Sequence, residues 1–579
     1  MTSRPRRLGE GWILGGCKQE TGANVAVGGN RTGYITMPWR SALLAIGLLS
    51  TRPASAQDAT WLANPGSADF NTASNWNPAT LPTGTAFFNT SAITSLTSAT
   101  GTALGGLTLN AGASNYTFTI SNVLWQFNGA GIIINGGSAS ITVNNGGIFF
   151  NNSSTAGSAT INGGLDFFNT STAGSATLNN GLSATSFFNN STAANAVINN
   201  NNLSGLFFDD NSTAGSATII NTNNSGILFL NSSTAGGATI TNSSQITFEN
   251  SSTAGNATIT NNNLLQFINS STAGNAAITN TGGATIQFQN TSTAGSAAII
   301  NNSGFIDFGD SSTAGSAAIA NNGGEINFIQ SSTAGGATIT NNGLIFFEDT
   351  ATGGTARLIN GATGGIDLSN LSSAGMSVGS IEGAGTISLG SKNLTVGANN
   401  LSTTFSGVIG DGGLFGGFGG SVTKIGTGTL ALSGANLYTG VTIVNGGTLE
   451  VDGSIATSSG VTVNSGGALS GIGNVSATTI NAGGTLAPGN AANPTGTLAI
   501  TGSLAFASGA LYLVQVVNTR AAGTVVTGNA TLGGATVDAI FAPGSSVAKQ
   551  YIIVTAGSVS GTFNPNLVAT NFRRASARR

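Results

Sequence analysis

The sequence contains no histidine and has few charged residues for its length. Its 579 residues include 16 Lys or Arg, 19 Asp or Glu and no His. Without an imidazole, the chain cannot form a Ser-His-Asp or Cys-His catalytic group. It also cannot use histidine to bind zinc or haem. These absences exclude several common classes of hydrolase and metalloenzyme.

Cysteine and basic residues are also scarce. The single cysteine, Cys17, precedes the segment that we expect to be cleaved on export, so the mature chain has no disulfide and no thiolate site. Residues 57–572 carry 5 basic and 17 acidic residues, a net charge of −12. Phosphate binding requires clustered cations, and the five basic residues are scattered. The sequence therefore predicts no nucleic-acid partner, no metal and no cofactor.

Glycine is abundant, whereas proline is rare. The chain has 88 Gly and 10 Pro, its hydrophobic content is 40% and its mean hydropathy is +0.20. The low proline content excludes collagen and proline-rich linkers, and the hydrophobic content argues against charge-rich disorder. A chain of small, uncharged and aliphatic residues favours stacked β-structure.

Residues 37–56 have the three parts of a secretory signal peptide. Arg40 supplies a positive charge, residues 42–49 are an apolar run, and an Ala-x-Ala cleavage motif precedes Gln57. The apolar run is about half the length that spans a bilayer. We therefore expect an exported chain without a transmembrane helix, and residues 1–36 as an extension upstream of the true start.

The centre of the chain repeats a unit of about twenty residues that contains Ser-Thr-Ala, usually followed by Gly. Its threonines lie 17 to 21 residues apart, with Ala four residues after each Thr and Ile or Leu six residues after it. Residues two apart point to the same face of a strand, so this Ala and Ile face the core. The threonines are Thr155, Thr172, Thr192, Thr213, Thr234, Thr253, Thr272, Thr293, Thr313, Thr333 and Thr352.

A second strand in each repeat places Phe four or five residues before the Thr, and an Asn-rich turn separates the two strands. We expect the Phe to stack in the core, and the Asn to serve the turn and stack their amides, because Asn tolerates left-handed backbone angles. The predicted Phe column is Phe150, Phe168, Phe188, Phe208, Phe229, Phe248, Phe267, Phe288, Phe308, Phe328 and Phe347. The predicted Asn column includes Asn242, Asn261, Asn280, Asn301, Asn321 and Asn341.

One such unit cannot bury its apolar face alone, but stacked units can, with neighbouring coils about 4.8 Å apart. The sequence therefore predicts an all-β chain, a right-handed parallel β-helix with coils of about 20 residues. The period-two alternation excludes a helical solenoid. Outward pairs such as Thr239 and Thr241 resemble the arrays of ice-binding solenoids, but Ala277, Ala298 and Ala318 interrupt the pattern.

The flanks of the repeat resemble a known family. Residues 424–440 read KIGTGTLALSGANLYTG, and a Gly-Thr-Leu and Gly-Gly pattern continues to Asn490. This stretch resembles the passenger-associated transport repeat and β-strand repeats of bacterial autotransporters, which use type V secretion. Residues 495–563 resemble the C-terminal part of such passengers, and the Trp-rich segment 61–78 resembles their first cap.

The resemblance implies export by a signal peptide, a β-helical passenger and a C-terminal outer-membrane β-barrel that carries the passenger to the surface. Only 16 residues follow Phe563, and they end in a basic tail, residues 571–579. We therefore expect the barrel to be missing through a frameshift, a gene-model error or a real truncation. The family places the chain at the cell surface, in the outer membrane or outside the cell; without a barrel it would remain periplasmic.

These features predict a series of segments along the chain. They are an extension (1–36), a signal peptide (37–56), an N-terminal cap with the first coils (57–145), the Ser-Thr-Ala-Gly solenoid (146–370), Gly-rich irregular coils (371–420), the passenger-associated repeat with the C-terminal part of the passenger (421–566) and a basic tail (567–579).

The leading functional hypothesis is a structural or adhesive surface protein without catalytic residues, whose partner is an unknown surface ligand, glycan or protein. The main alternative is a β-helix enzyme acting on polysaccharide, which requires clustered carboxylates. A non-functional gene fragment is a third possibility. The carboxylates available to an enzyme are the pairs Asp209-Asp210 and Glu348-Asp349 and the group Asp307, Asp310 and Glu325, which lies on adjacent coils.

Overall fold

The computed structural model describes residues 24–26, 34–36, 56–543, 545 and 550–571. The chain divides into two units, residues 1–55 and 56–579. In the first unit, strand β1 (Asn24–Ala26) pairs antiparallel with β2 (Tyr34–Thr36). The predicted signal peptide lies outside the described residues, apart from its last residue.

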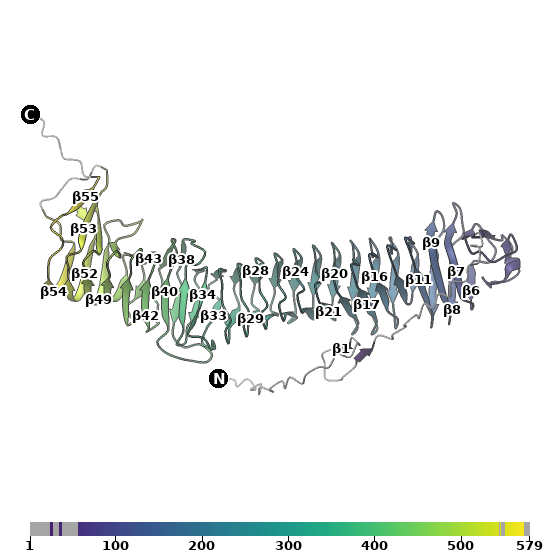
Figure 1. The fold of residues 1–579 in the computed structure, drawn as a ribbon, viewed down its shortest axis with the longest axis horizontal. Helices are drawn as coiled ribbons and strands as arrows, with labels where there is room; N and C mark the ends of the chain where they lie inside the picture. The colour runs from purple at the N-terminus through teal and green to yellow at the C-terminus, as the bar shows by residue number, and fades with distance from the viewer. Residues whose placement is uncertain (1–23, 27–33, 37–55, 544, 546–549, 572–579) are drawn as a thin grey trace, which may run out of the picture. The chain divides into compact units, whose positions relative to one another are not determined.

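The second unit is a parallel β-solenoid of about 22 coils with about 21 residues each. Its coils stack one after another along the row of strands in Figure 1. The only helix among the described residues is a 3-10 turn, η1 (Ala73–Asn75). The predicted all-β, β-helical fold is confirmed.

Three sheets form the solenoid: the first runs along nearly its whole length, the second ends at residue 410, and the third begins at residue 375. Strands from successive coils pair almost entirely in parallel. The first sheet comprises β6 (Ser95–Ser98), β8 (Tyr116–Ser121), β10 (Ala139–Asn144), β12 (Thr160–Asn162), β14 (Thr177–Asn180), β16 (Val197–Asn200), β18 (Thr218–Asn221), β20 (Thr239–Asn242), β22 (Thr258–Asn261), β24 (Ala277–Asn280), β26 (Ala298–Asn301), β28 (Ala318–Asn321), β30 (Thr338–Asn341), β32 (Arg357–Asn360), β35 (Ser380–Gly383), β38 (Thr403–Phe405), β41 (Thr429–Leu432), β43 (Gly447–Val451), β46 (Gly467–Gly471), β48 (Thr485–Pro488), β50 (Leu511–Val517), β51 (Arg520–Ala521), β53 (Thr536–Phe541) and β55 (Val568–Thr570). The second comprises β3 (Ala59–Trp61), β4 (Trp76–Asn77), β5 (Thr85–Phe88), β7 (Thr102–Leu109), β9 (Leu124–Ile134), β11 (Gly147–Phe150), β13 (Leu165–Phe167), β15 (Thr185–Phe187), β17 (Gly205–Phe208), β19 (Gly226–Phe229), β21 (Gln245–Phe248), β23 (Leu264–Phe267), β25 (Thr285–Phe288), β27 (Phe305–Phe308), β29 (Glu325–Phe328), β31 (Leu344–Phe347), β33 (Gly365–Asp367), β36 (Thr386–Ser388) and β39 (Val408–Gly410). The third comprises β34 (Gly375–Val378), β37 (Asn393–Val396), β40 (Ser421–Lys424), β42 (Val441–Val444), β44 (Ser454–Ile455), β45 (Gly460–Val463), β47 (Asn474–Ile480), β49 (Thr497–Phe506), β52 (Gly523–Thr531) and β54 (Val554–Ser560).

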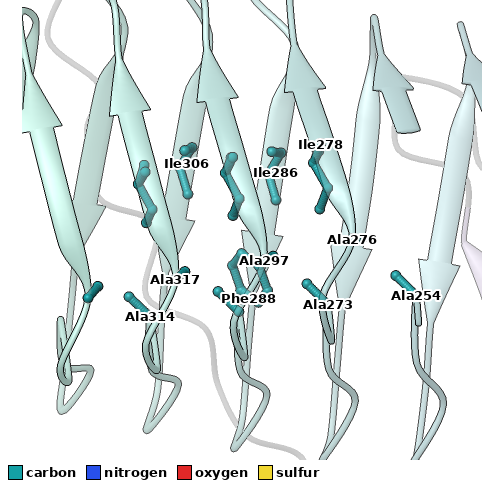
Figure 2. Packing of buried hydrophobic residues seen from close by; sticks show 14 of the residues in the cluster. Ala254, Ala273, Ala276, Ile278, Ile286, Phe288, Ala297, Ile306, Ala314 and Ala317 are labelled. Carbon is teal, nitrogen blue, oxygen red and sulfur yellow. The ribbon is translucent and has the colours of Figure 1, made fainter. Parts of the chain in front are cut away.

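The core of the Ser-Thr-Ala-Gly coils consists of columns of like side chains: the Phe and Ala columns are uniform, and the aliphatic columns are mainly Ile and Leu. Figure 2 shows Ala276, Ile278, Ile286 and Phe288 among these columns, and all four are at most 1% exposed. Eleven Phe rings form one continuous stack, with neighbouring centroids 4.5–4.9 Å apart and planes within 4–8° of parallel. These distances lie within the range of favourable stacked aromatic pairs.

Two members of the predicted Phe column are wrong. Phe167 and Phe187 occupy the core stack, whereas Phe168 and Phe188 lie outside it, partly buried and stacked on each other with centroids 5.1 Å apart. The core position lies five residues before each Thr in every coil. In these two coils a second Phe follows the core Phe, and the alternation of the strand turns it outward.

The Asn column is buried, and its residues end the strands of the first sheet. Each Asn donates from Nδ2 to Oδ1 of the Asn in the next coil at 2.8–3.2 Å, from Asn180 to Asn360. The stacked amides were predicted, but these Asn do not supply the left-handed backbone. That conformation belongs to a different, exposed column at the opposite turn, which includes Asn231, Asn250 and Asn269.

The Ser-Thr-Ala-Gly motif itself forms the third side of each coil. Consecutive threonines such as Thr253 and Thr272 are joined by single parallel β-bridges. Thr253 Oγ1 accepts the N–H of Gly255 at 3.0 Å, and Gly255 has a φ of +61°. A Cβ on Gly255 would lie 2.9 Å from the Gly236 carbonyl oxygen of the preceding coil, so both backbone angle and space favour glycine there. One coil departs from this rule, because Ala194 occupies the same position with a φ of +50°.

The first coils after residue 56 have a core of large aromatic side chains instead of uniform columns. Trp61, Trp76 and Phe70 are at most 2% exposed, and Trp76 lies 5.1 Å from Trp61 and 5.0 Å from Phe70 between ring centroids. The indole of Trp76 donates to the Phe70 carbonyl oxygen at 2.9 Å. The Trp-rich segment of the sequence therefore packs over the first regular coils.

Candidate functional site

The outward side chains of the Ser-Thr-Ala-Gly coils are short and mostly uncharged. Thr239, Thr241, Thr258, Ala277 and Ala298 alternate with buried Ile on the first sheet and are exposed to solvent. The outward orientation predicted for these threonines is confirmed. Alanines interrupt the threonine pairs on this surface, as the sequence indicated.

The acidic pair Asp209-Asp210 belongs to the exposed turn column. Asp210 Oδ2 accepts the backbone N–H and the Nδ2 of Asn189 in the preceding coil, both at 2.9 Å. Asp209 Oδ1 accepts Nδ2 of Asn231 in the next coil at 2.5 Å. These carboxylates therefore join neighbouring turns.

The structure brings Asp307 and Glu325 together and places Asp310 in a different role. Asp310 Oδ2 accepts the backbone N–H and Nδ2 of Asn290 at 2.8 and 3.0 Å, within the turn column. Asp307 Oδ1 accepts Nδ2 of Asn327 at 2.8 Å on the outer face of the second sheet. Partial burial raises the pKa of Asp307, and the negative charge of Glu325 raises it further.

Glu348 extends this acidic surface toward the next coils. Its Oε2 accepts Nδ2 of Asn370 at 2.8 Å. Burial raises the pKa of Glu348, and the charges of Asp349, Glu325 and Asp367 raise it further. Asp367 also belongs to this group. It was not singled out from the sequence, because the pairing register of the strands decides which residues of different coils lie side by side.

The part of the chain that the structure describes contains neither a cluster of metal-binding side chains nor a membrane-spanning helix. No group of three or more acidic, His or Cys side chains is arranged to hold a metal ion among residues 24–26, 34–36, 56–543, 545 and 550–571. Within those same residues, no helix is long and apolar enough to cross a membrane.

The coils after residue 420 contain a buried lysine that the sequence reasoning missed. Lys424 ends β40, is 1% exposed, and donates from Nζ to the carbonyl oxygens of Ile425 at 2.6 Å and Gly446 at 3.1 Å. Burial lowers the pKa of Lys424 to about 8. The ammonium joins two successive coils, because β40 pairs with β42 and Gly446 follows β42.

Residues 422–451 match the passenger-associated-transport-repeat family. The match covers most of β40 and all of β41, β42 and β43, which are the strands of two stacked coils. This repeat and the β-solenoid fit an autotransporter passenger domain. A comparison with curated proteins gives no significant match. The resemblance inferred from residues 424–490 is therefore confirmed over the matched segment.

The family suggests an exported protein of the cell surface or its surroundings, with a structural role. The prediction that the chain has no catalytic, cofactor-binding or metal-binding residues remains a prediction. The structure unites only some of the carboxylates that the enzyme alternative requires, namely Asp307 with Glu325 and, beside them, Glu348.

Proposed function

We propose that the chain is the adhesive or structural passenger of an autotransporter-type surface protein, exported by residues 37–56 and cleaved before Gln57. The passenger repeat at residues 422–451 supports the passenger part of this proposal. The regular columns of the solenoid support it further, since about 22 coils spaced about 4.8 Å apart extend an exposed surface over roughly 100 Å.

Such a solenoid acts as a rigid spacer, because each coil is joined to the next by backbone bonds, the Phe stack and the Asn column. Its outer faces carry Thr, Ser, Asn and Ala, which offer hydroxyls and amides without strong charge. These groups suit multivalent contact with a glycan or protein on another surface, and many weak contacts in a row give avidity.

The experiment compares diderm bacteria that produce the chain from its native gene, together with any β-barrel that the downstream DNA encodes, with bacteria that lack the gene. External protease should degrade the chain on intact cells, and producing cells should attach to one another or to a coated surface more strongly. Mass analysis of the mature chain should give an N-terminus at Gln57. Protection from protease on intact cells, or unchanged attachment, would contradict the proposal. Depolymerisation of a polysaccharide by the purified chain would favour the enzyme alternative, with Asp307→Asn as its first variant.

A further inference from the structure

A loop between β39 and β40 presents three large apolar side chains to solvent. Leu414 is 71% exposed, Phe415 59% and Phe418 85%. No other stretch of five described residues in the solenoid has three large apolar side chains this exposed. The loop directly precedes β40 along the chain. Exposed apolar groups gathered at one point mark an interaction site more often than scattered ones do.

The sequence of this loop, residues 412–420, is GGLFGGFGG. Five of its glycines, at 412, 413, 416, 417 and 419, have φ between +69° and +115°, a region that other residues rarely adopt. At Gly420 a Cβ would lie 2.7 Å from Leu389 Cβ. Every position of the loop where a side chain fits therefore carries Leu or Phe, although loops usually carry polar residues there.

Hydrogen bonds hold the loop in this shape. Asp411 accepts the N–H groups of Gly419 at 3.2 Å and Gly420 at 2.9 Å. From an earlier coil, Asp367 accepts the N–H of Leu414 at 2.7 Å. Because the backbone is fixed, the apolar side chains cannot turn inward without breaking these bonds, and little conformational entropy is lost on binding.

Further hydrogen bonds are formed by the backbone N–H groups of residues 412–416. Phe415 donates its N–H to Ser369 Oγ at 3.1 Å. Gly412 donates to the Gly417 carbonyl oxygen at 3.0 Å, and Gly416 donates to that of Gly413 at 3.1 Å. A segment that enters an apolar phase must form the hydrogen bonds of its backbone groups within the protein. Most of the N–H groups in this loop have such a partner.

We propose that residues 412–420 are a membrane-inserting tip, which binds a lipid bilayer by burying Leu414, Phe415 and Phe418 among the acyl chains. The three side chains expose on the order of 400 Å², about half of the roughly 800 Å² that each partner buries in a stable protein interface. A bilayer accepts so small a protrusion without a matching pocket. Asp367 and Asp411 at its base favour a zwitterionic surface over an anionic one.

This inference goes beyond the proposed function, because it concerns the loop alone and holds whether or not the chain mediates adhesion. The test is flotation of the purified full chain with phosphatidylcholine vesicles. The variant Leu414→Ser, Phe415→Ser, Phe418→Ser should bind at least about tenfold more weakly, a loss of about 1.4 kcal/mol. The matched control is Leu182→Ser, Leu203→Ser, which removes two leucines that are 84% and 64% exposed in other turns and should bind as the unmodified chain does.

A second measurement keeps the test independent of folding. In Phe418→Trp, brominated acyl chains should quench more of the tryptophan fluorescence than in the unmodified chain, in which Trp61, Trp76 and Trp125 are buried. Admixture of phosphatidylglycerol should weaken binding. Equal flotation of the triple variant, equal loss in the control, or absence of quenching would overturn the proposal. Loss of a dimer in the triple variant, with vesicle binding unchanged, would instead assign the loop to contact with a second copy.

Discussion

At the scale of single residues, the serine of the repeat motif is an unusual core residue. Ten of these serines, from Ser154 to Ser332, are fully buried, and their Oγ atoms have no hydrogen-bond partner in the structure. A buried hydroxyl without a partner costs free energy. The hydroxyl of the neighbouring Thr accepts a backbone N–H in the turn, as Thr253 does from Gly255. The Thr hydroxyl therefore stabilises the fold, whereas the Ser hydroxyl does not.

Ser252→Ala should therefore leave the free energy of unfolding unchanged or raise it by up to about 1 kcal/mol, because it removes an unpartnered hydroxyl. The control in the same motif is Thr253→Ala, which removes the acceptor of the Gly255 N–H and should lower stability. Denaturant unfolding followed by far-UV circular dichroism measures both. A loss of more than about 1 kcal/mol for Ser252→Ala would indicate a partner for Oγ, such as ordered water.

Lys424 makes stability depend on pH on the alkaline side. Its pKa of about 8 in the folded chain is below the ordinary lysine value of about 10.4. Between these values the unfolded chain binds more protons than the folded one, so stability should rise with pH. In Lys424→Met this rise should disappear, because the variant has no side chain at position 424 that titrates in this range. A rise that is the same in Lys424→Met would contradict this assignment.

At the scale of the coil, the Phe stack and its neighbours determine stability. Phe248 is fully buried, and its ring lies 4.5 Å from that of Phe229 and 4.9 Å from that of Phe267. Phe248→Ala should lower the free energy of unfolding by about 3–5 kcal/mol. Thr258→Ala on the exposed face should change it by less than about 0.5 kcal/mol. Hydrogen exchange should locate the damage in the adjacent coils, since contacts in a solenoid are between nearest neighbours.

The same coil illustrates how far the sequence predicts the fold. A fixed spacing of Ala and Ile after each Thr was enough to predict the strands and their inward face. Phe168 was misassigned because an offset of four or five was accepted, whereas requiring five in every coil selects Phe167. The Asn column was expected in the turn, but its amides lie inside, because a stacked amide column satisfies its own hydrogen bonds from coil to coil.

Contacts across coils set the limit of prediction for the candidate site. Asp367 approaches Glu348, and Asp367 also binds the N–H of Leu414, which is 47 residues away. Such pairs depend on the register of irregular coils, and no spacing in the sequence specifies it. The apolar loop did have a sequence signal, namely that Leu414, Phe415 and Phe418 are the only side chains in a run of glycine.

At the scale of the whole molecule, the charge distribution sets the response to acid. Residues 57–572 carry a net charge of −12, and burial raises the pKa of Asp307, Glu348, Glu249 and Glu450. A carboxyl with a raised pKa binds its proton more tightly in the folded chain than in the unfolded chain. Between the ordinary carboxyl value near 4 and the raised value, the folded state therefore holds more protons, and stability falls as pH rises.

The chain should accordingly be more stable at about pH 4.5, near the ordinary carboxyl pKa, than at about pH 7.5, whereas carboxylates held by ion pairs would give the opposite trend. The thermal unfolding midpoint by circular dichroism measures the difference. Asp307→Asn combined with Glu348→Gln should reduce it, because both changes remove a carboxyl that is costly to ionise. Asp210→Asn combined with Asp310→Asn is the matched control: it also removes two carboxyls, but from the turn column, where the preceding coils carry Asn189 and Asn290. If this control reduces the difference as much as the first double variant does, net charge alone governs the acid response and burial of Asp307 and Glu348 does not.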